Sequence, residues 1–200
     1  MPSIVIPFRG AGAKRRLALG EPARAALAHA MLADVLASSC SVGSVVVVTD
    51  DPVAVRLAAA AGAEVSADPG GGQGPAVAAG LERATEEPRL VVNADLPCAT
   101  EADVRLLLQA TPERGIAVVA ASDGTTNALG LSHAGAFAAL YGPGSAARFL
   151  AHSRRLALEA VALPIAGLAD DVDTQDDLAR VAARVGPHTR AAVASLGLAA

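Results

Sequence analysis

The chain has 200 residues, a hydrophobic content of 52% and a formal net charge of -4, which suits one folded domain built around one core. Lys and Arg form no run that could follow a phosphate backbone, so nucleic acid is excluded as an expected partner. Gly, Pro or charged residues interrupt every apolar stretch before the ~18 to 20 residues that a membrane span needs, and the N-terminus lacks the pattern of a secretory leader.

We therefore expect one cytoplasmic domain over residues 1–200 with no membrane partner, while the oligomeric state stays open. Cys40 and Cys98 have no CxxC spacing and no nearby His at ligand spacing, so both are interpreted as small buried hydrophobes. The four histidines are scattered along the chain and are interpreted as structural or surface residues.

Short β-branched runs alternate with alanine-rich segments along the chain. Strands are predicted at residues 3–7, 45–49, 89–94, 116–121 and 128–132. Helices are predicted at residues 22–37, 52–61, 75–84, 101–110 and 145–153, followed by further strands and a last helix after Asp173. The alternation predicts an α/β fold with a mostly parallel sheet and helices on both faces.

A glycine-bearing, cationic loop follows the first predicted strand. It contains Arg9, Gly10, Gly12, Lys14 and Arg16. Glycines let backbone N–H groups approach phosphate oxygens, and the cations would neutralise the charge on a departing pyrophosphate. The spacing fits neither a Walker A loop nor a dinucleotide fingerprint. The loop therefore predicts a triphosphate site, and the alternative is a solvated basic turn.

Three aspartates occupy positions suited to a divalent cation. Asp95 ends the predicted strand at 89–94, and the carboxyl ends of strands form the ligand crevice of open α/β sheets. Asp171 and Asp173 are two residues apart, so in an extended segment they point to the same side. Mg²⁺ prefers such carboxylates together with substrate phosphates. The alternatives are that Asp95 caps a turn and that Thr174 caps an acidic helix.

Two polar loops in the second half of the chain offer groups for an anion. Thr126 and Asn127 supply a hydroxyl and an amide that could reach a phosphate or carboxylate. Gly142, Ser145 and Arg148 belong to a glycine-rich turn that opens a helix, and N–H groups at a helix start bind anions. The alternative for each segment is an ordinary loop with capping.

Taken in order, these motifs resemble one family, the 2-phospho-L-lactate or phosphoenolpyruvate guanylyltransferases of coenzyme F(420) biosynthesis. The resemblance rests on the basic first loop together with Asn-Ala-Asp-Leu-Pro at 93–97, Gly-Thr-Thr-Asn-Ala-Leu at 124–129, Gly-Pro-Gly-Ser-Ala-Ala-Arg at 142–148 and Asp-Val-Asp-Thr at 171–174. It implies a single-domain, Rossmann-like nucleotidyltransferase fold of the nucleotide-diphospho-sugar transferase type. It also implies transfer of GMP from GTP to a phosphorylated three-carbon acid, with release of pyrophosphate.

The resemblance also assigns residues to roles. It implies that Asp95, Asp171 and Asp173 hold Mg²⁺, with Asp95 counted as catalytic beside the cations of the first loop. Thr126, Gly142 and Ser145 would bind the acid, and we add their neighbours Asn127 and Arg148. The nucleotide would meet the first loop, with its two glycines and Lys14, and the segment around Gly74.

Several alternatives stay open at this point. Phosphoenolpyruvate is the favoured acceptor, while 2-phospho-L-lactate and 3-phosphoglycerate present the same carboxylate and phosphate on three carbons. The nearest alternative is that the chain is another nucleotidyltransferase of the same fold, with a molybdopterin or sugar-phosphate substrate. A nonenzymatic nucleotide-binding module is the alternative from another class.

Overall fold

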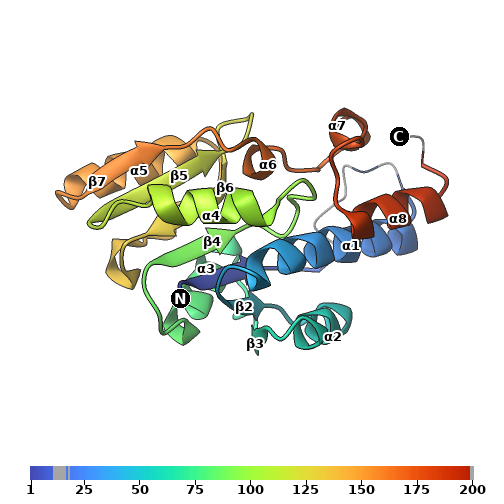
Figure 1. Cartoon of the computed structure of the whole chain (residues 1–200), viewed down its shortest axis with the longest axis horizontal. Coiled ribbons are helices and arrows are strands. Elements are labelled where there is room, and N and C mark those ends of the chain that lie inside the picture. The colour runs from blue at the N-terminus through green and yellow to red at the C-terminus, as the bar shows by residue number, and fades with distance from the viewer. Residues whose placement is uncertain (11–16, 18, 199–200) are drawn as a thin grey trace.

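The computed structural model describes residues 1–10, 17 and 19–198, which form an α/β fold with helices on both faces of one sheet (Figure 1). The seven strands lie in the order β3-β2-β1-β4-β6-β5-β7. Their bounds are β1 Ser3–Pro7, β2 Ser44–Val48, β3 Glu64–Ser66, β4 Arg89–Val92, β5 Gly115–Ala120, β6 Thr126–Leu131 and β7 Glu159–Ala162.

Eight α-helices and one short 3-10 helix, η2, are found among these residues. Their bounds are α1 Glu21–Cys40, α2 Pro52–Ala60, α3 Gln73–Arg83, α4 Glu101–Ala110, η2 Ala134–Ala136, α5 Ser145–Arg155, α6 Ala166–Ala169, α7 Gln175–Val181 and α8 Pro187–Ser195. No helix in this part of the chain combines the length and the apolar character that crossing a bilayer requires.

The sheet is mostly parallel, as predicted, with one reversed strand. β1 pairs in parallel with β2 and β4, β2 pairs in parallel with β3, and β5 pairs in parallel with β7. β6 runs antiparallel to both β4 and β5. The start of β6 therefore lies at the same edge as the carboxyl ends of the parallel strands.

Alternate residues of each strand face opposite helical layers. In β1, Ile4 and Ile6 belong to the core cluster shared with α1, α2, α4 and α6 to α8, whereas Val5 belongs to the cluster shared with α3 and α5. This is the period of two that strand geometry imposes. Both faces of the sheet are covered, which explains why the strands read as continuous Val and Ile runs rather than as polar-apolar alternation.

The predicted elements up to the 145–153 helix are present, with ends that differ by a few residues, whereas the described residues after that helix form one strand, β7, in place of the several expected. The capping box expected at the start of the 101–110 helix is formed by Thr100 and Asp103. The prediction missed the edge strand β3, the short helix α6 and the second C-terminal helix α8. Cys98 is buried as expected, while Cys40 is only half-buried, and neither forms a disulfide.

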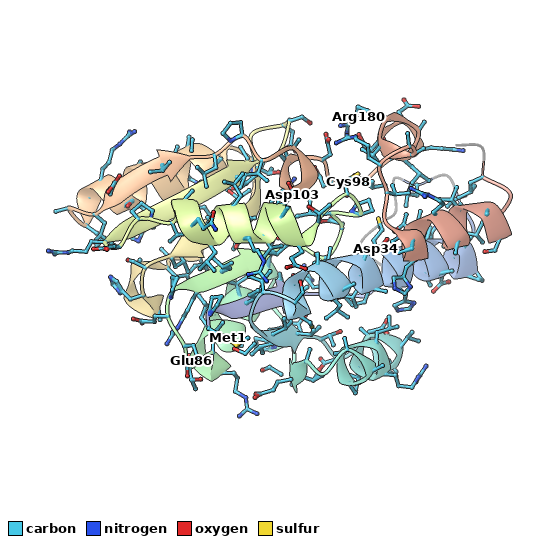
Figure 2. The ribbon with its side chains drawn as sticks, in the orientation of Figure 1. Met1, Asp34, Glu86, Cys98, Asp103 and Arg180 are labelled. Carbon is cyan, nitrogen blue, oxygen red and sulfur yellow. The ribbon has the colours of Figure 1, made fainter. Side chains whose placement is uncertain are left out.

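Helix α8 is fixed to α1 by a buried carboxylate. Asp34 of α1 is 3% exposed and accepts hydrogen bonds from the backbone N–H groups of His188 (3.0 Å) and Thr189 (2.9 Å), at the start of α8. Figure 2 shows Asp34 between the two helices. A Cβ atom at Gly186 would fall 2.4 Å from this carboxylate, so the close approach requires glycine there. Asp34 thus satisfies N–H groups that α8 cannot pair internally.

We expect Asp34→Ala to lower the free energy of unfolding by about 1 to 3 kcal/mol, because it leaves buried N–H groups without an acceptor. Urea denaturation measures the change. Asp34→Asn keeps an acceptor oxygen and should lose less. Glu82→Ala, an exposed change on α3 with the same change in net charge, is the matched control. Equal stability of Asp34→Ala and this control would contradict the assignment.

Candidate active site

A cavity of about 220 Å³ opens at the edge of the sheet where β1 and β4 end. One wall comes from the segment after β1 and from α1, and the other comes from the start of α3 and the residues that follow β4. The described lining residues are Pro7, Phe8, Arg9, Gly10, Ala28, Met31, Gln73, Asn93, Ala94 and Asp95. The cavity therefore brings part of the predicted triphosphate loop, Arg9 and Gly10, to the predicted metal ligand Asp95.

The three predicted metal ligands converge at this edge. One carboxylate oxygen from each of Asp95, Asp171 and Asp173 lies within 4.8 Å of the others. A backbone hydrogen bond from Val172 N–H to the Asp95 carbonyl (3.1 Å) joins the two segments. The Val172 side chain is fully buried, so its two neighbours are directed toward the sheet edge. The buried Val172 and its hydrogen bond to Asp95 thus bring Asp173 close to Asp95, although the two aspartates are far apart in the sequence.

Asp171 is held in an environment that disfavours its negative charge. Burial raises the pKa of Asp171, and the neighbouring charges of Asp95 and Asp173 raise it further, against the lowering effect of its hydrogen bonds. One of these bonds comes from the Asn127 amide, which donates to Asp171 Oδ1 (3.3 Å) and to the Ala169 carbonyl (3.1 Å). Asn127, predicted as an acid-binding residue, therefore holds a carboxylate of the cluster in place.

The nearby aspartates outside the cluster have other partners. Asp170 forms ion pairs with Arg180 and with Arg184, and Asp177 pairs with Arg180. The hydrogen bonds to Arg180 and Arg184 lower the pKa of Asp170 despite its partial burial. Asp177 also completes a capping box with Thr174 at the start of α7, so the capping alternative holds beside the metal hypothesis. Arginines thus neutralise the flanking acids Asp170 and Asp177.

The predicted acid-binding turn lies where β6 begins and α5 starts. The hydroxyls of Thr126 and Ser145 are 2.9 Å apart, and both residues are buried. Gly142 has a φ of 112°, a conformation that L side chains rarely adopt. The N–H groups of Ser145 and Ala146 donate to the carbonyls of Gly142 and Gly124, so two N–H groups of this helix start are already paired.

Arg148 and Gly74, which were predicted to bind ligands, each have a structural role in the fold. The Arg148 guanidinium donates to the carbonyls of Leu140 (2.7 and 3.2 Å) and Tyr141 (3.0 Å), which fixes the turn before Gly142. Gly74 is buried within α3, where a Cβ atom would lie 2.7 Å from the Ala139 side chain. Gly74 packs against that segment, and the cavity wall is formed by its neighbour Gln73. Roles for Arg148 and Gly74 in ligand binding stay predictions.

The described residues include part of the predicted first loop. Arg9 is exposed and Gly10 half-buried at the cavity, whereas Gly12, Lys14 and Arg16 lie outside the described residues. Beside Gly10, Asp51 caps α2 and pairs with His29 Nε2 at 3.1 Å. This pair agrees with the prediction that His29 is a structural residue.

Two amide side chains of the site were not among the predicted site residues. Gln73 Nε2 donates to Asn93 Oδ1 (2.6 Å), and Asn93 Nδ2 donates to the Thr126 carbonyl (3.1 Å). The available signal for Asn93 was its place two residues before Asp95 at a strand end. Gln73 follows three glycines of positive φ and carried no comparable sequence signal.

Solved structures share this architecture. A structure assigned as a nucleotide-diphospho-sugar transferase from Desulfovibrio desulfuricans matches with a TM-score of 0.79 and 18% identity, covering 98% of this chain and 95% of that one. A nucleotidyl transferase from Methanothermobacter thermautotroptrophicus matches with a TM-score of 0.64 and 16% identity, covering 90% and 95% of the two chains. The chain therefore has the fold of the nucleotide-diphospho-sugar transferases, with an acidic cluster at the edge where that class of sheet binds ligands.

Sequence relatives narrow this class to a family. The phosphoenolpyruvate guanylyltransferase of Streptomyces scabiei is 36% identical over 97% of this chain and 96% of its own length. That of Thermomonospora curvata is 39% identical over 97% of this chain and 89% of its own length. The family model described as guanylyl transferase CofC like matches residues 2–198, and the chain belongs to this family.

The raised pKa of Asp171 predicts how metal-free stability depends on pH. An acid whose pKa is higher in the folded state than in the unfolded state stabilises the fold at low pH, and this contribution is lost as pH rises through the folded value. Asp171→Asn keeps the acceptor for Asn127 and removes the charge. We expect a higher free energy of unfolding than wild type at pH 7 in EDTA, with the difference narrowing toward pH 4.

Urea denaturation with and without Mg²⁺ completes this test. Wild type should gain stability when Mg²⁺ is added, because a cation offsets the repulsion among the three carboxylates, and Asp171→Asn should gain less. A metal-free variant that is less stable than wild type at pH 7 would contradict the prediction.

Proposed function

We propose that this chain transfers GMP from GTP to phosphoenolpyruvate and releases pyrophosphate, with Mg²⁺ held by Asp95, Asp171 and Asp173. The observation that supports it is the convergence of these carboxylates within 4.8 Å, at a cavity that Arg9 also lines, in a chain of the guanylyl transferase family. The named relatives support phosphoenolpyruvate over 2-phospho-L-lactate. The reaction would serve coenzyme F(420) biosynthesis in the cytoplasm.

The donor set fits Mg²⁺. Each residue of the cluster offers a carboxylate oxygen, which is the hard ligand that Mg²⁺ prefers, and this set would leave positions open for triphosphate oxygens and water. Burial and the neighbouring charges of Asp95 and Asp173 raise the pKa of Asp171, and a cation among the three carboxylates would favour their charged forms. When bound, Mg²⁺ supplies charge neutralisation at the phosphates and aligns the reacting oxygens.

The reaction needs no proton acceptor on the protein. An oxygen of the acid's phosphate forms a bond to the α-phosphorus of GTP, and the bond from that phosphorus to the bridging oxygen of the β-phosphate breaks. That oxygen leaves with its electron pair as part of pyrophosphate. Because the attacking phosphate is ionised near neutral pH, it can attack without a histidine to remove a proton.

The protein's contribution is to position and to neutralise. Arg9 at the cavity mouth would contact the triphosphate, and we assign Lys14 and Arg16 of the same loop to the same task. Thr126, Gly142 and Ser145 would receive the acid, on a turn that Arg148 fixes from outside. Asn127 joins the two halves, because it neighbours Thr126 in the chain and holds Asp171 in space.

A matrix of substrates tests the proposed reaction. GTP, ATP, CTP and UTP are each combined with phosphoenolpyruvate, 2-phospho-L-lactate and 3-phosphoglycerate, and pyrophosphate release is measured with Mg²⁺. We expect the highest kcat/KM for GTP with phosphoenolpyruvate. Binding of GTP and Mg²⁺ without pyrophosphate release from any pair would instead support a nonenzymatic nucleotide-binding module.

Substitution of the cluster tests the assigned metal ligands. We expect Asp95→Ala and Asp173→Ala to fold normally and to lose about 10²- to 10³-fold in kcat, as is typical when one electrostatic stabiliser of a transition state is removed. Steady-state kinetics measure the loss, and circular dichroism verifies folding. Asp176→Ala, an exposed change on α7 near the cluster in sequence, should keep wild-type kcat. Near-wild-type rates for Asp95→Ala would refute the assignment.

A further inference from the structure

Gln73 lines the cavity at the point where α3 begins. It is the first residue of α3, it is half-buried, and it lines the cavity together with Asn93 and Asp95. Its amide reaches across to Asn93, the residue that follows β4. The start of α3 and the end of β4 are thus joined at the cavity wall by two neutral amides.

The hydrogen bonds fix the orientation of both amides. A backbone carbonyl can only accept, so Asn93 must present Nδ2 to the Thr126 carbonyl at 3.1 Å. Asn93 Oδ1 therefore faces Gln73 and, being an acceptor, requires Nε2 of Gln73 at 2.6 Å. This order removes the usual ambiguity of amide side chains. Gln73 Oε1 is the acceptor that remains for a ligand in the cavity.

The lining of the cavity combines charged, neutral polar and apolar groups. Asp95, which belongs to the carboxylate cluster, and Arg9 carry charge, which suits the phosphates and their cation. Phe8, Ala28 and Met31 provide apolar walls, which suit the faces of a base, while Gln73 and Asn93 supply neutral polar groups. Few polar groups placed among apolar walls are what fixes orientation and specificity in small-molecule sites.

We infer that Gln73 selects the base of the nucleotide, with Oε1 accepting hydrogen bonds from the N1–H and exocyclic N2–H groups of guanine. The inference rests on the proposed function for the class of substrate and adds the residue that reads it. A carbonyl oxygen has two lone pairs and accepts from two adjacent donors. Adenine lacks the N2 amine and has an unprotonated N1, so it offers Oε1 only its N6 amine.

Nucleotide binding tests the inference without requiring turnover. Dissociation constants for GTP, ITP, ATP and 2′-deoxy-GTP are measured by calorimetry on the full chain with Mg²⁺. ITP keeps N1–H and lacks the N2 amine, so wild type should bind GTP most tightly, ITP less tightly and ATP least. Each lost hydrogen bond should weaken binding by about fivefold, which corresponds to the contribution of about 1 kcal/mol typical of a neutral hydrogen bond.

Gln73→Met keeps the length of the side chain and removes both the acceptor Oε1 and the donor to Asn93. We expect this variant to bind GTP, ITP and ATP with nearly equal affinity, and to raise the KM for GTP without changing the KM for phosphoenolpyruvate. Gln109→Met, the same chemical change at an exposed position of α4, should keep the wild-type order. Melting temperatures verify that both variants fold.

The outcomes separate the inference from the proposed function. Loss of the GTP preference in Gln73→Met alone supports the inference even if no acceptor is turned over. A preserved preference in Gln73→Met overturns it, as does a wild type that binds the three purine nucleotides equally. Wild type could bind 2′-deoxy-GTP more weakly than GTP, while Gln73→Met binds the two equally. That result would place Gln73 at the ribose and overturn the base assignment. If Gln73→Met changes only the KM for phosphoenolpyruvate, the base assignment is also overturned.

Discussion

The site depends on one short segment that ties the C-terminal part of the chain to the end of β4. The Val172 N–H donates to the Asp95 carbonyl, and the Val172 side chain is buried in the core. Because neighbouring side chains of an extended segment point in opposite directions, burying Val172 directs Asp171 and Asp173 outward beside Asp95. Core packing, rather than any attraction among the acids, therefore brings three like charges together. Burial, together with the neighbouring charges of Asp95 and Asp173, raises the pKa of Asp171.

The reversed strand β6 gives the site its second half. Had β6 been parallel to β4, its first residues would lie at the opposite edge of the sheet. Because it is antiparallel, Thr126 and Asn127 lie just beyond Val92, where Asn93 N–H donates to the Asn127 carbonyl. The acid-binding turn, the metal cluster and the cavity thereby share one edge. Asn93 and Asn127 are the polar links among them, and both are fixed by backbone carbonyls.

Charged and neutral groups have separate tasks at this edge. Carboxylates collect where a cation and phosphates would meet, and arginines outside the cluster neutralise the flanking Asp170 and Asp177. The neutral amides Gln73 and Asn93 line the same cavity as apolar side chains. This mixture of groups fits a nucleotide, which has a charged triphosphate at one end and a neutral base at the other.

The sequence by itself determined the alternation of strands and helices, the placement of Asp95 at a strand end and the pairing of Asp171 with Asp173. These features are local, since they depend on side-chain period, turn residues and capping. The start of α4 at Glu101, for example, follows from the Thr100 and Asp103 capping box alone. The ordered motifs also sufficed to indicate the family.

Only the tertiary structure decided which distant groups meet. The direction of β6, the docking of α8 on Asp34 and the bond between Val172 and Asp95 join segments that no local pattern connects. The same holds for the amides of Gln73 and Asn93, whose orientations are set by a carbonyl contributed from β6. Each is a long-range contact selected by the packing of the whole core, and for that reason the sequence indicated the segment around Gly74 but not that Gln73 itself would line the cavity.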